Sequence, residues 1–357
     1  SVEFFGRAGL FRLPYTNRPV DLIPDYPVTA ETVIDYVRAL FGYIDLFPNA
    51  KQGSKERAYA SRVRVTDATC STPKHEGWWM DPDDAKRKKT IVPRILSTPK
   101  PTAFQHYLVQ EREDAGGLLA YDGPGRKAKR VTTLRGHKYY WHQGERSIAD
   151  LEDPEFRTRR PDQQERDTQH TQLNPVKPNV DFSFRVHFEN LSEEELGALC
   201  WALKLPGPEK DSDGKDLRFY HHLGMGKPYG MGSVQLNPVL HIINRKDRYT
   251  DLFTTDVSGA LGWTTGDQTE EMDGYIRAFE KHILGILGHI DDEHQLCDLE
   301  RIESLLRLHQ WKGVPADWRA HDDAVAAIAA GNRRATPPDR DTLGNTRHML
   351  PQEFRHR

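Results

Sequence analysis

The chain of 357 residues is 37% hydrophobic and 29% charged, and its formal net charge at pH 7 is -3. Its length suits one large domain or two. The sequence contains no run of about eighteen apolar residues, which is the pattern that predicts a membrane-spanning helix. A net charge this close to zero argues against a protein whose whole surface binds nucleic acid, but it is compatible with a local basic groove. Cys70, Cys200 and Cys297 are widely separated, which favours thiols in a reducing compartment and therefore a cytoplasmic location.

The N-terminal region is extended and aromatic, and residues 2–5 already have the pattern of a strand. The sequence starts at Ser1 without a methionine or a signal-peptide pattern, so we interpret the chain as a fragment of a longer one. Farther along, Thr29 is suited to cap the start of a helix that ends at Phe41. Gly42 is a typical residue at a helix C-terminus.

Residues 60–68 alternate between apolar and polar positions, which predicts a strand. Val63 and Val65 fall on one face of that strand, and Arg62 and Arg64 fall on the other. The pattern therefore indicates a basic face opposite an apolar one.

Two long segments have no regular hydrophobic pattern. Residues 71–102 are irregular, and residues 144–174 are highly charged with few apolar positions, so we predict flexible insertions near both. Between them, a run of aromatic residues predicts a strand at 134–142.

The second half of the chain begins with a strand and a helix. Apolar residues at every second position predict a strand at 181–188, and Ser192 with Glu195 forms the capping-box pattern at the start of a helix. The elements expected farther on are a strand at 239–243, helices at about 271–290 and 298–308, a short helix at 324–330, and a tail beyond 336.

The stretch from His221 to Leu236 reads HHLGMGKPYGMGSVQL and holds four glycines in the pattern G-x-G-x-x-x-G-x-G. Glycine adopts positive φ readily and lets another backbone come close. The spacing differs from both the dinucleotide-binding fingerprint and the P-loop, and a strand follows it instead of a helix. The stretch therefore predicts a tight turn whose backbone can contact a strand, a phosphate or a nucleic-acid chain.

Together with its neighbours, this stretch resembles the RAMP superfamily of CRISPR-associated proteins. The similar elements are a strand F-x-F-x-V-x-F-x-N-L at 182–191, a helix containing E-L-G-A-L at 195–199, and H-x-L-G-M-G-K-P-x-G-M-G-S-V at 221–234. A helix ending in F-G before S-R-V-R-V-T-D-A at 61–68 is also similar, as is S-T-P-K-P-T-x-F-Q-x-Y-L at 97–108. Within the superfamily, the chain looks most like the last backbone-like domain of the giant single-chain type III-E effector, after its insertion.

The resemblance implies an α+β fold with a ferredoxin-like (RRM-like) core and long insertions at 1–245, followed by a C-terminal helical extension and tail at 246–357. It implies a guide-RNA-binding backbone module of a type III CRISPR effector, which holds the crRNA and the guide–target duplex in antiviral defence. The implied partners are guide RNA, target RNA, other backbone-like domains and, in some members, a TPR–caspase-like protease. The chain itself is expected to be non-catalytic within an RNA-guided endoribonuclease.

RNA binding requires cations for phosphates, flat side chains for bases, and backbone that can approach the strand closely. The residues that we expect to contact RNA are Arg62, Arg64, Lys100, Phe104, Gln105, Arg135, Lys138, Tyr139, His222, Gly224, Gly226, Lys227, Tyr229, Gly230 and Gly232.

Two other functions remain open. In a guide-processing endoribonuclease of the same superfamily, His221 and His222 would suggest acid–base chemistry. The related nucleases place their histidine nearer their own start, however, and Asp67 fits the end of a strand better than a catalytic position. In a structural scaffold without RNA contact, Arg62 and Lys227 would be dispensable for RNA binding.

A metal site has weak support in the sequence. Cys70 and His75 are five positions apart, but no second pair lies at zinc-finger spacing. We therefore predict no zinc and no cofactor other than the bound guide RNA.

Overall fold

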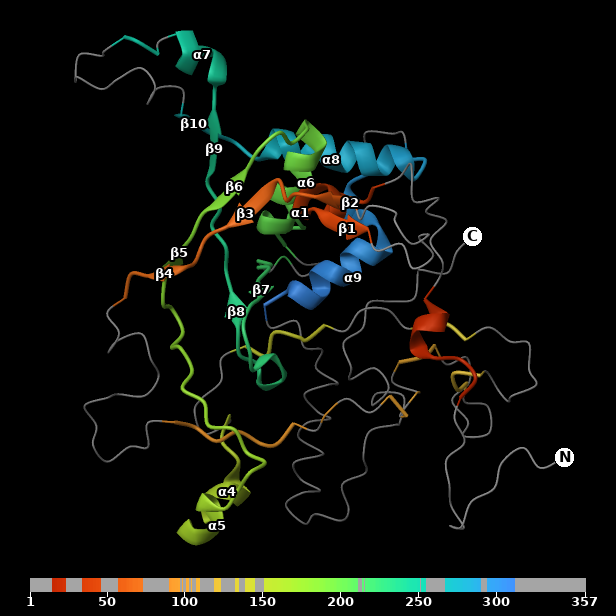
Figure 1. Ribbon diagram of the computed structural model, residues 1–357, viewed down its shortest axis with the longest axis vertical. Coiled ribbons are helices and arrows are strands. Elements are labelled where there is room, and N and C mark those ends of the chain that lie inside the picture. Colours follow the sequence, from red (N-terminus) through yellow and green to blue (C-terminus); the bar gives the residue numbers. More distant parts are fainter. Residues whose placement is uncertain are drawn as a thin grey trace, which may run out of the picture.

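A computed structural model of the chain describes residues 15–23, 34–45, 57–72, 90–96, 98, 101–102, 104, 107–109, 119–122, 132–134, 139–144, 151–210, 214, 216–250, 252–254, 267–289 and 294–311. Short antiparallel strand pairs and helices make up this part of the protein, which is therefore α+β (Figure 1). None of its helices is long and apolar enough to cross a membrane.

The elements follow one another along the chain in three groups. The first group is η1 (Pro19–Leu22), α1 (Tyr36–Phe41), β1 (Tyr43–Asp45), β2 (Arg57–Tyr59), β3 (Val63–Val65) and β4 (Thr69–Cys70). The second is α4 (Pro154–Thr158), α5 (Pro161–Glu165), β5 (Phe182–Ser183), β6 (Val186–Phe188) and α6 (Glu193–Lys204). The third is β7 (His221–His222), η3 (Lys227–Tyr229), β8 (Ser233–Val234), β9 (Leu240–Ile243), α7 (Arg245–Thr250), β10 (Asp267–Glu270), α8 (Asp273–Ile286), η5 (Leu296–Asp298) and α9 (Glu300–His309).

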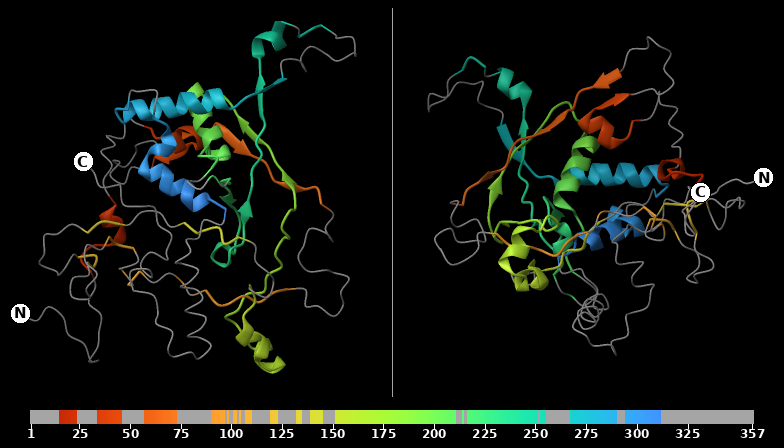
Figure 2. Two further views of the ribbon diagram at one scale, coloured as in Figure 1. Left: turned by 180° about the vertical axis from the view of Figure 1, so that it is seen from behind. Right: turned by 60° about the horizontal axis from the view of Figure 1, so that its bottom comes forward.

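The main core lies where α6 packs against α8, with η5 and α9 beside them (Figure 2). Its buried side chains are Leu196, Cys200, Trp201, Leu205, Leu240, Met272, Ile276, Leu284, Leu296 and Leu306. Gly197 sits at the closest approach of the two helices, since a Cβ at this position would lie 2.0 Å from the carbonyl oxygen of Tyr275. Because α8 and α9 follow residue 245 and α6 precedes it, the predicted core and the predicted C-terminal extension share this cluster.

A second, smaller core joins α1 and α6 to the β3–β6 pair. Leu40, Val63 and Leu199 are buried there in contact with one another. The β3–β6 register places Val63 opposite Phe188, so the strand predicted at 60–68 lies beside the strand predicted at 181–188. The two segments are far apart in sequence, and their pairing closes one side of the fold.

Two extended strand pairs leave these cores. The β3–β6 pair continues into β4–β5 as a ribbon (Figure 1). Val65 on this ribbon is 60% exposed, so the predicted apolar face is buried only at Val63. The other is the β9–β10 hairpin, which carries α7 at its far end.

Several local predictions are confirmed. The helix after Ser192 runs from Glu193 to Lys204, and its capping box forms as expected, with Ser192 Oγ accepting from Glu195 N at 3.2 Å. Gly42 follows α1 with a φ of +74°, as predicted, but the helix begins at Tyr36 and not after Thr29, because the Asp35 side chain accepts from Arg38 N and caps it there. The predicted helices near 271–290 and 298–308 are α8 and α9.

The predicted strand at 134–142 is wrong within the described part of the chain. Leu134 forms one isolated bridge with Leu108, and residues 139–144 have no strand structure. The aromatic run instead supplies buried side chains, such as Trp141, and a fully buried His142 whose ring makes the contacts described below. The predicted short helix at 324–330 and the tail lie outside the described residues.

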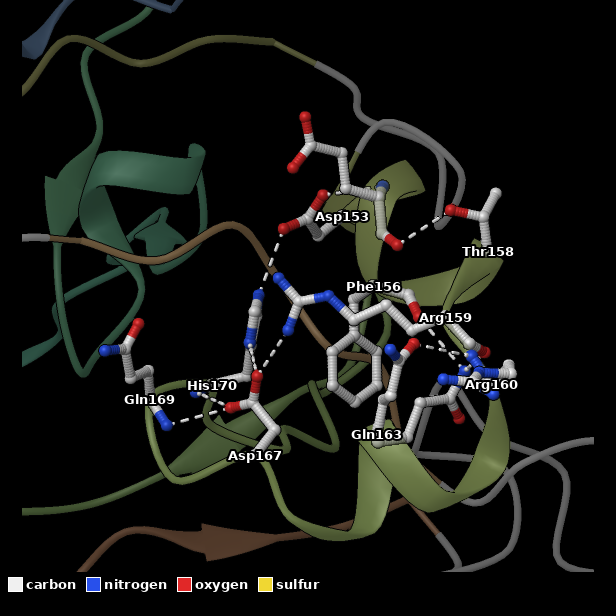
Figure 3. A network of polar contacts seen from close by, with 11 residues as sticks. Asp153, Phe156, Thr158, Arg159, Arg160, Gln163, Asp167, Gln169 and His170 are labelled. Carbon is white, nitrogen blue, oxygen red and sulfur yellow. Dashed lines mark hydrogen bonds and ion pairs between the residues drawn. The ribbon is translucent and has the colours of Figure 1, made fainter.

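The charged segment at 144–174 also differs from the flexible insertion that its composition predicts. Residues 151–174 contain the short helices α4 and α5, and a polar network joins the segments around them (Figure 3). His170 lies between two carboxylates, 3.0 Å from Asp153 Oδ2 and 2.9 Å from Asp167 Oδ2, and Arg159 donates to the same Asp167 oxygen at 2.6 Å. Burial alone would lower the pKa of His170, but the hydrogen bonds to the two carboxylates outweigh it and raise that pKa.

Candidate nucleic-acid interface

The glycine-rich stretch folds as a short hairpin, which we call the glycine hairpin (residues 221–234). In it, β7 and β8 pair antiparallel, with His222 opposite Ser233, and η3 forms the turn between them. Leu223 N donates to the carbonyl oxygen of Gly232 at 2.8 Å and extends the pairing by one step. The structure therefore confirms a tight turn leading into a strand.

Glycine is required at several points of this hairpin. Gly226 and Gly230 flank η3 with φ values of +74° and +84°, in the left-handed region. At Gly232 a Cβ would lie 2.1 Å from the carbonyl oxygen of Leu223, so any side chain there would break the pairing. Gly224 also has positive φ, at +78°, but apart from its two chain neighbours no described residue places a heavy atom within 4 Å of its Cβ position. The hairpin is thus closed at its base and open beside Gly224.

Two contacts tie the turn to distant parts of the chain. The Tyr229 hydroxyl donates to the carbonyl oxygen of Arg94, and Gln143 Nε2 donates to the carbonyl oxygen of Pro228 at 3.2 Å. These contacts, with the internal bonds from Tyr229 N to Gly226 O and from Gly230 N to Lys227 O, fix the orientation of the turn.

A stacked pair of histidines supports the base of the glycine hairpin. The rings of His142 and His222 are nearly parallel, with centroids 3.8 Å apart. His142 Nε2 donates to the carbonyl oxygen of Tyr220 at 2.9 Å, which leaves Nδ1 to accept from Ser233 Oγ at 2.7 Å. Trp311 covers this cluster at 6.1 Å from the His142 ring.

Both stacked rings are held in the neutral form. Burial lowers the pKa of His142 to about 3, and the neighbouring His222 adds to the shift. Burial likewise lowers the pKa of His222 to about 4. The backbone of Tyr140 lies close to the ring without reaching hydrogen-bond geometry, and it partly offsets this lowering. His309 and Lys227 contribute repulsion to the protonated His222 ring. Two neutral imidazoles can stack without charge repulsion, which explains how the pair tolerates burial.

The Ser233–His142 contact has the geometry of a nucleophile and a base, which sequence reasoning missed. A useful general base needs a pKa near the working pH, and a ring with a pKa of about 3 is a weak base. The contact is better explained as a tether between residues 139–144 and β8. The signal that could have found it, a histidine after an aromatic run, is too common to be specific.

Lys227 is the cation that the glycine hairpin presents. It is half-buried at the start of η3, and its ammonium group has no hydrogen-bond or ion-pair partner in the part of the chain that the structure describes. A Lys amine placed next to glycine backbone is suited to bind a phosphate as a point charge.

Arg62 has a different setting from the one expected of a phosphate contact. Its guanidinium donates to both carboxylate oxygens of Glu195, to the carbonyl oxygen of Ala39 at 2.9 Å and to that of Asn190 at 2.7 Å. The first of these contacts also lowers the pKa of Glu195, the residue that completes the capping box of α6. Arg62 therefore joins β3, α1 and α6 through four hydrogen bonds to protein acceptors.

Replacing Arg62 with alanine is expected to lower the free energy of unfolding by about 2 to 3 kcal/mol, because a partly buried carboxylate loses its partner. The matched control is Arg64→Ala on the same strand, where the side chain is 71% exposed and 3.9 Å from Glu189. That change should alter stability by about 0.5 kcal/mol at most. Urea unfolding of both variants is the measurement, and equal effects would contradict the role given to Arg62.

The other residues expected to contact RNA fall into three groups. Phe104 is half-buried and makes an edge contact with Tyr15 at 6.5 Å, and Tyr139 packs at 5.6 Å from the His309 ring. His222, Gly224, Gly226, Lys227, Tyr229, Gly230 and Gly232 are brought together in the glycine hairpin. Lys100, Gln105, Arg135 and Lys138 lie outside the described residues.

No metal centre emerges within the described ranges, where no group of three or more His, Cys, Asp or Glu side chains could hold an ion. Cys70 is exposed, and its predicted neighbour His75 lies outside those ranges. All three cysteines are free thiols. Burial raises the pKa of Cys200 to about 11, which is the setting of an inert core thiol.

Comparison with known proteins finds no protein-family model that matches the chain and no curated protein that matches it.

Proposed function

We propose that this chain is a guide-RNA-binding backbone module of a type III CRISPR effector, with a ferredoxin-like core of the RAMP type and long insertions. It would hold the crRNA and the guide–target duplex in antiviral defence. The observation that carries this function is the glycine hairpin, in which a fixed turn presents Lys227 without a protein partner in the described part of the chain.

The arrangement of the resembling segments supports the same function. The strand of the S-R-V-R-V block is β3, the strand of the F-x-F-x-V-x-F block is β6, and the two are hydrogen-bonded neighbours. The helices that adjoin them, α1 and α6, bury Leu40 and Leu199 against β3. A strand pair packed against two helices is one part of a β-α-β-β-α-β ferredoxin-like core, and the other described strands form separate two-stranded pairs.

The partners in this proposal are guide RNA, target RNA, further backbone-like domains and a TPR–caspase-like protease. Its location would be the cytoplasm, in keeping with the free thiols of Cys70, Cys200 and Cys297. The chain would position RNA for an effector that cleaves it, without supplying catalytic residues.

Binding of a labelled single-stranded RNA, followed by fluorescence anisotropy at several salt concentrations, tests this function. Lys227→Ala is expected to weaken binding about tenfold and to reduce the slope of log affinity against log salt by about 0.7, because one phosphate contact is lost. The control is Lys281→Ala on α8, an exposed lysine outside the glycine hairpin, which should leave affinity and slope unchanged.

The two alternatives predict different behaviour toward RNA. A structural scaffold would not bind the RNA, or would bind it equally well with and without Lys227. A guide-processing endoribonuclease would cut a repeat RNA in the absence of any other protein.

A further inference from the structure

The glycine hairpin exposes two large apolar side chains beside its cation. Leu223 is 66% exposed and Met225 is 80% exposed, on either side of Gly224. The other methionine of the turn behaves differently: Met231 packs under the loop, where its Sδ lies 2.6 Å from the Cβ position of Gly226. One methionine therefore fills the inside of the turn while the other faces outward.

The exposed Leu223 and Met225 lie on a backbone segment that hydrogen bonds hold in place. Leu223 N is bonded to Gly232 O at 2.8 Å, and Met231 N to Gly226 O at 3.2 Å, so both ends of the exposed segment are held. Apolar groups on an ordered backbone lose little conformational freedom when they bind, which favours their use as contacts. Apart from these two chain neighbours, no described residue places a heavy atom within 4 Å of the Cβ position of Gly224.

We propose that Leu223 and Met225 form an apolar wedge that contacts nucleobases of single-stranded RNA while Lys227 binds an adjacent phosphate. This inference rests on the RNA-binding function proposed above and adds the base-contacting residues. Single-stranded RNA fits because it offers apolar base faces and anionic phosphates within one nucleotide, as the hairpin offers apolar and cationic groups within five residues. Leucine and methionine are side chains that proteins insert between bases. Gly224, which lies between the two in sequence, has no side chain of its own to obstruct a base.

The test uses the 357-residue chain and a short single-stranded RNA of mixed sequence that carries 2-aminopurine. Binding of the wild type should raise the fluorescence of 2-aminopurine, because a wedge separates it from its stacked neighbour. The double variant Leu223→Ser plus Met225→Ser should bind about tenfold more weakly and lose this rise, with the salt slope unchanged because no charge is removed.

Matched variants separate the contributions of the wedge and the cation. Val239→Ser removes an apolar side chain that is 65% exposed elsewhere, and it should change neither affinity nor fluorescence. Lys227→Ala should reduce the salt slope but keep the fluorescence rise. Thermal melting checks that each variant is folded. If the double variant is unstable, Met225→Gln, which keeps the length of the side chain, takes its place and should show the same loss of affinity and of the fluorescence rise.

The outcomes distinguish the wedge from the proposed function. If the wild type does not bind the RNA, both fail. If the wild type binds and the double variant binds equally well with the same fluorescence rise, the wedge is wrong and the RNA-binding function stands. Loss of self-association with unchanged RNA affinity would also overturn the wedge, because it would assign the two side chains to a protein contact.

Discussion

Replacing Gly197 with alanine is expected to lower the free energy of unfolding by about 3 kcal/mol, the upper part of the range for overpacked cores. A Cβ at this position would lie 2.0 Å from the carbonyl oxygen of Tyr275 and 2.8 Å from the Cβ of Phe279. These atoms belong to the backbone and the first side-chain carbon of α8, so they cannot move aside independently. The two helices would have to separate, and the buried cluster between them would loosen.

The matched control is Gly285→Ala on α8, where no described residue beyond its chain neighbours and the backbone of α8 places a heavy atom within 4 Å of the Cβ position. There alanine should stabilise the protein by about 0.5 to 1 kcal/mol, since it favours the helix and meets no obstacle. Urea unfolding followed by circular dichroism measures both changes. If Gly197→Ala stabilised the protein as much as Gly285→Ala, α6 and α8 would not be in close contact at Gly197.

Stability is also expected to fall steeply as the pH decreases from 6.5 toward 4. His142 and His222 have folded-state pKa values of about 3 and about 4, against an ordinary value of 6.5. The unfolded chain therefore binds protons that the folded chain does not, so stability is full above pH 6.5 and declines below it. At about pH 5 each ring accounts for a loss of about 2 kcal/mol. Burial also lowers the pKa values of His221 and His309, which act in the same direction.

His222→Phe isolates the contribution of the stacked pair, because phenylalanine keeps a flat ring against His142 but does not titrate. The variant should lose about 2 kcal/mol less than the wild type between pH 7 and about pH 5. His187→Gln, at an exposed position on β6, is the control and should leave the pH dependence unchanged. Unfolding by urea at each pH gives the comparison, and identical pH profiles for wild type and His222→Phe would refute the buried neutral pair.

Local features of this fold are readable from the sequence because they depend on neighbouring residues. The capping box of Ser192 and Glu195 predicts the start of α6 correctly, since both partners lie within one turn. The glycine spacing predicts the turn at Gly226–Gly230 for the same reason, because positive φ is a property of single residues.

Long-range partners could not be predicted in this way. Arg62 has the pattern of a solvent-facing cation on a strand, and only folding brings it to Glu195, 133 positions away. The Ser233–His142 contact joins residues 91 positions apart, and nothing near either residue marks it. The candidate site was therefore located by its glycines, while the contact of His142 with Ser233 beneath it was missed.

The segment at 151–174 shows a third limit of sequence reasoning. Its many charges predict a solvated, flexible chain, because composition counts charges without pairing them. In the fold, Asp153 and Asp167 enclose His170, and Arg159 balances Asp167 (Figure 3). Because these charges are paired with one another, the segment can order around them, and it contains the helices α4 and α5.

The most direct test of the central claim is to express the chain with a repeat–spacer array, purify it, and sequence the RNA that it retains. Wild-type protein is predicted to carry RNA of one discrete guide length, and Lys227→Glu is predicted to lose it because the phosphate contact becomes repulsive. Arg62 is left unchanged, since its loss would destabilise the fold whether or not it contacts RNA. Absence of RNA from the folded wild type, or retention of the same RNA by folded Lys227→Glu, would contradict a guide-binding role for the glycine hairpin.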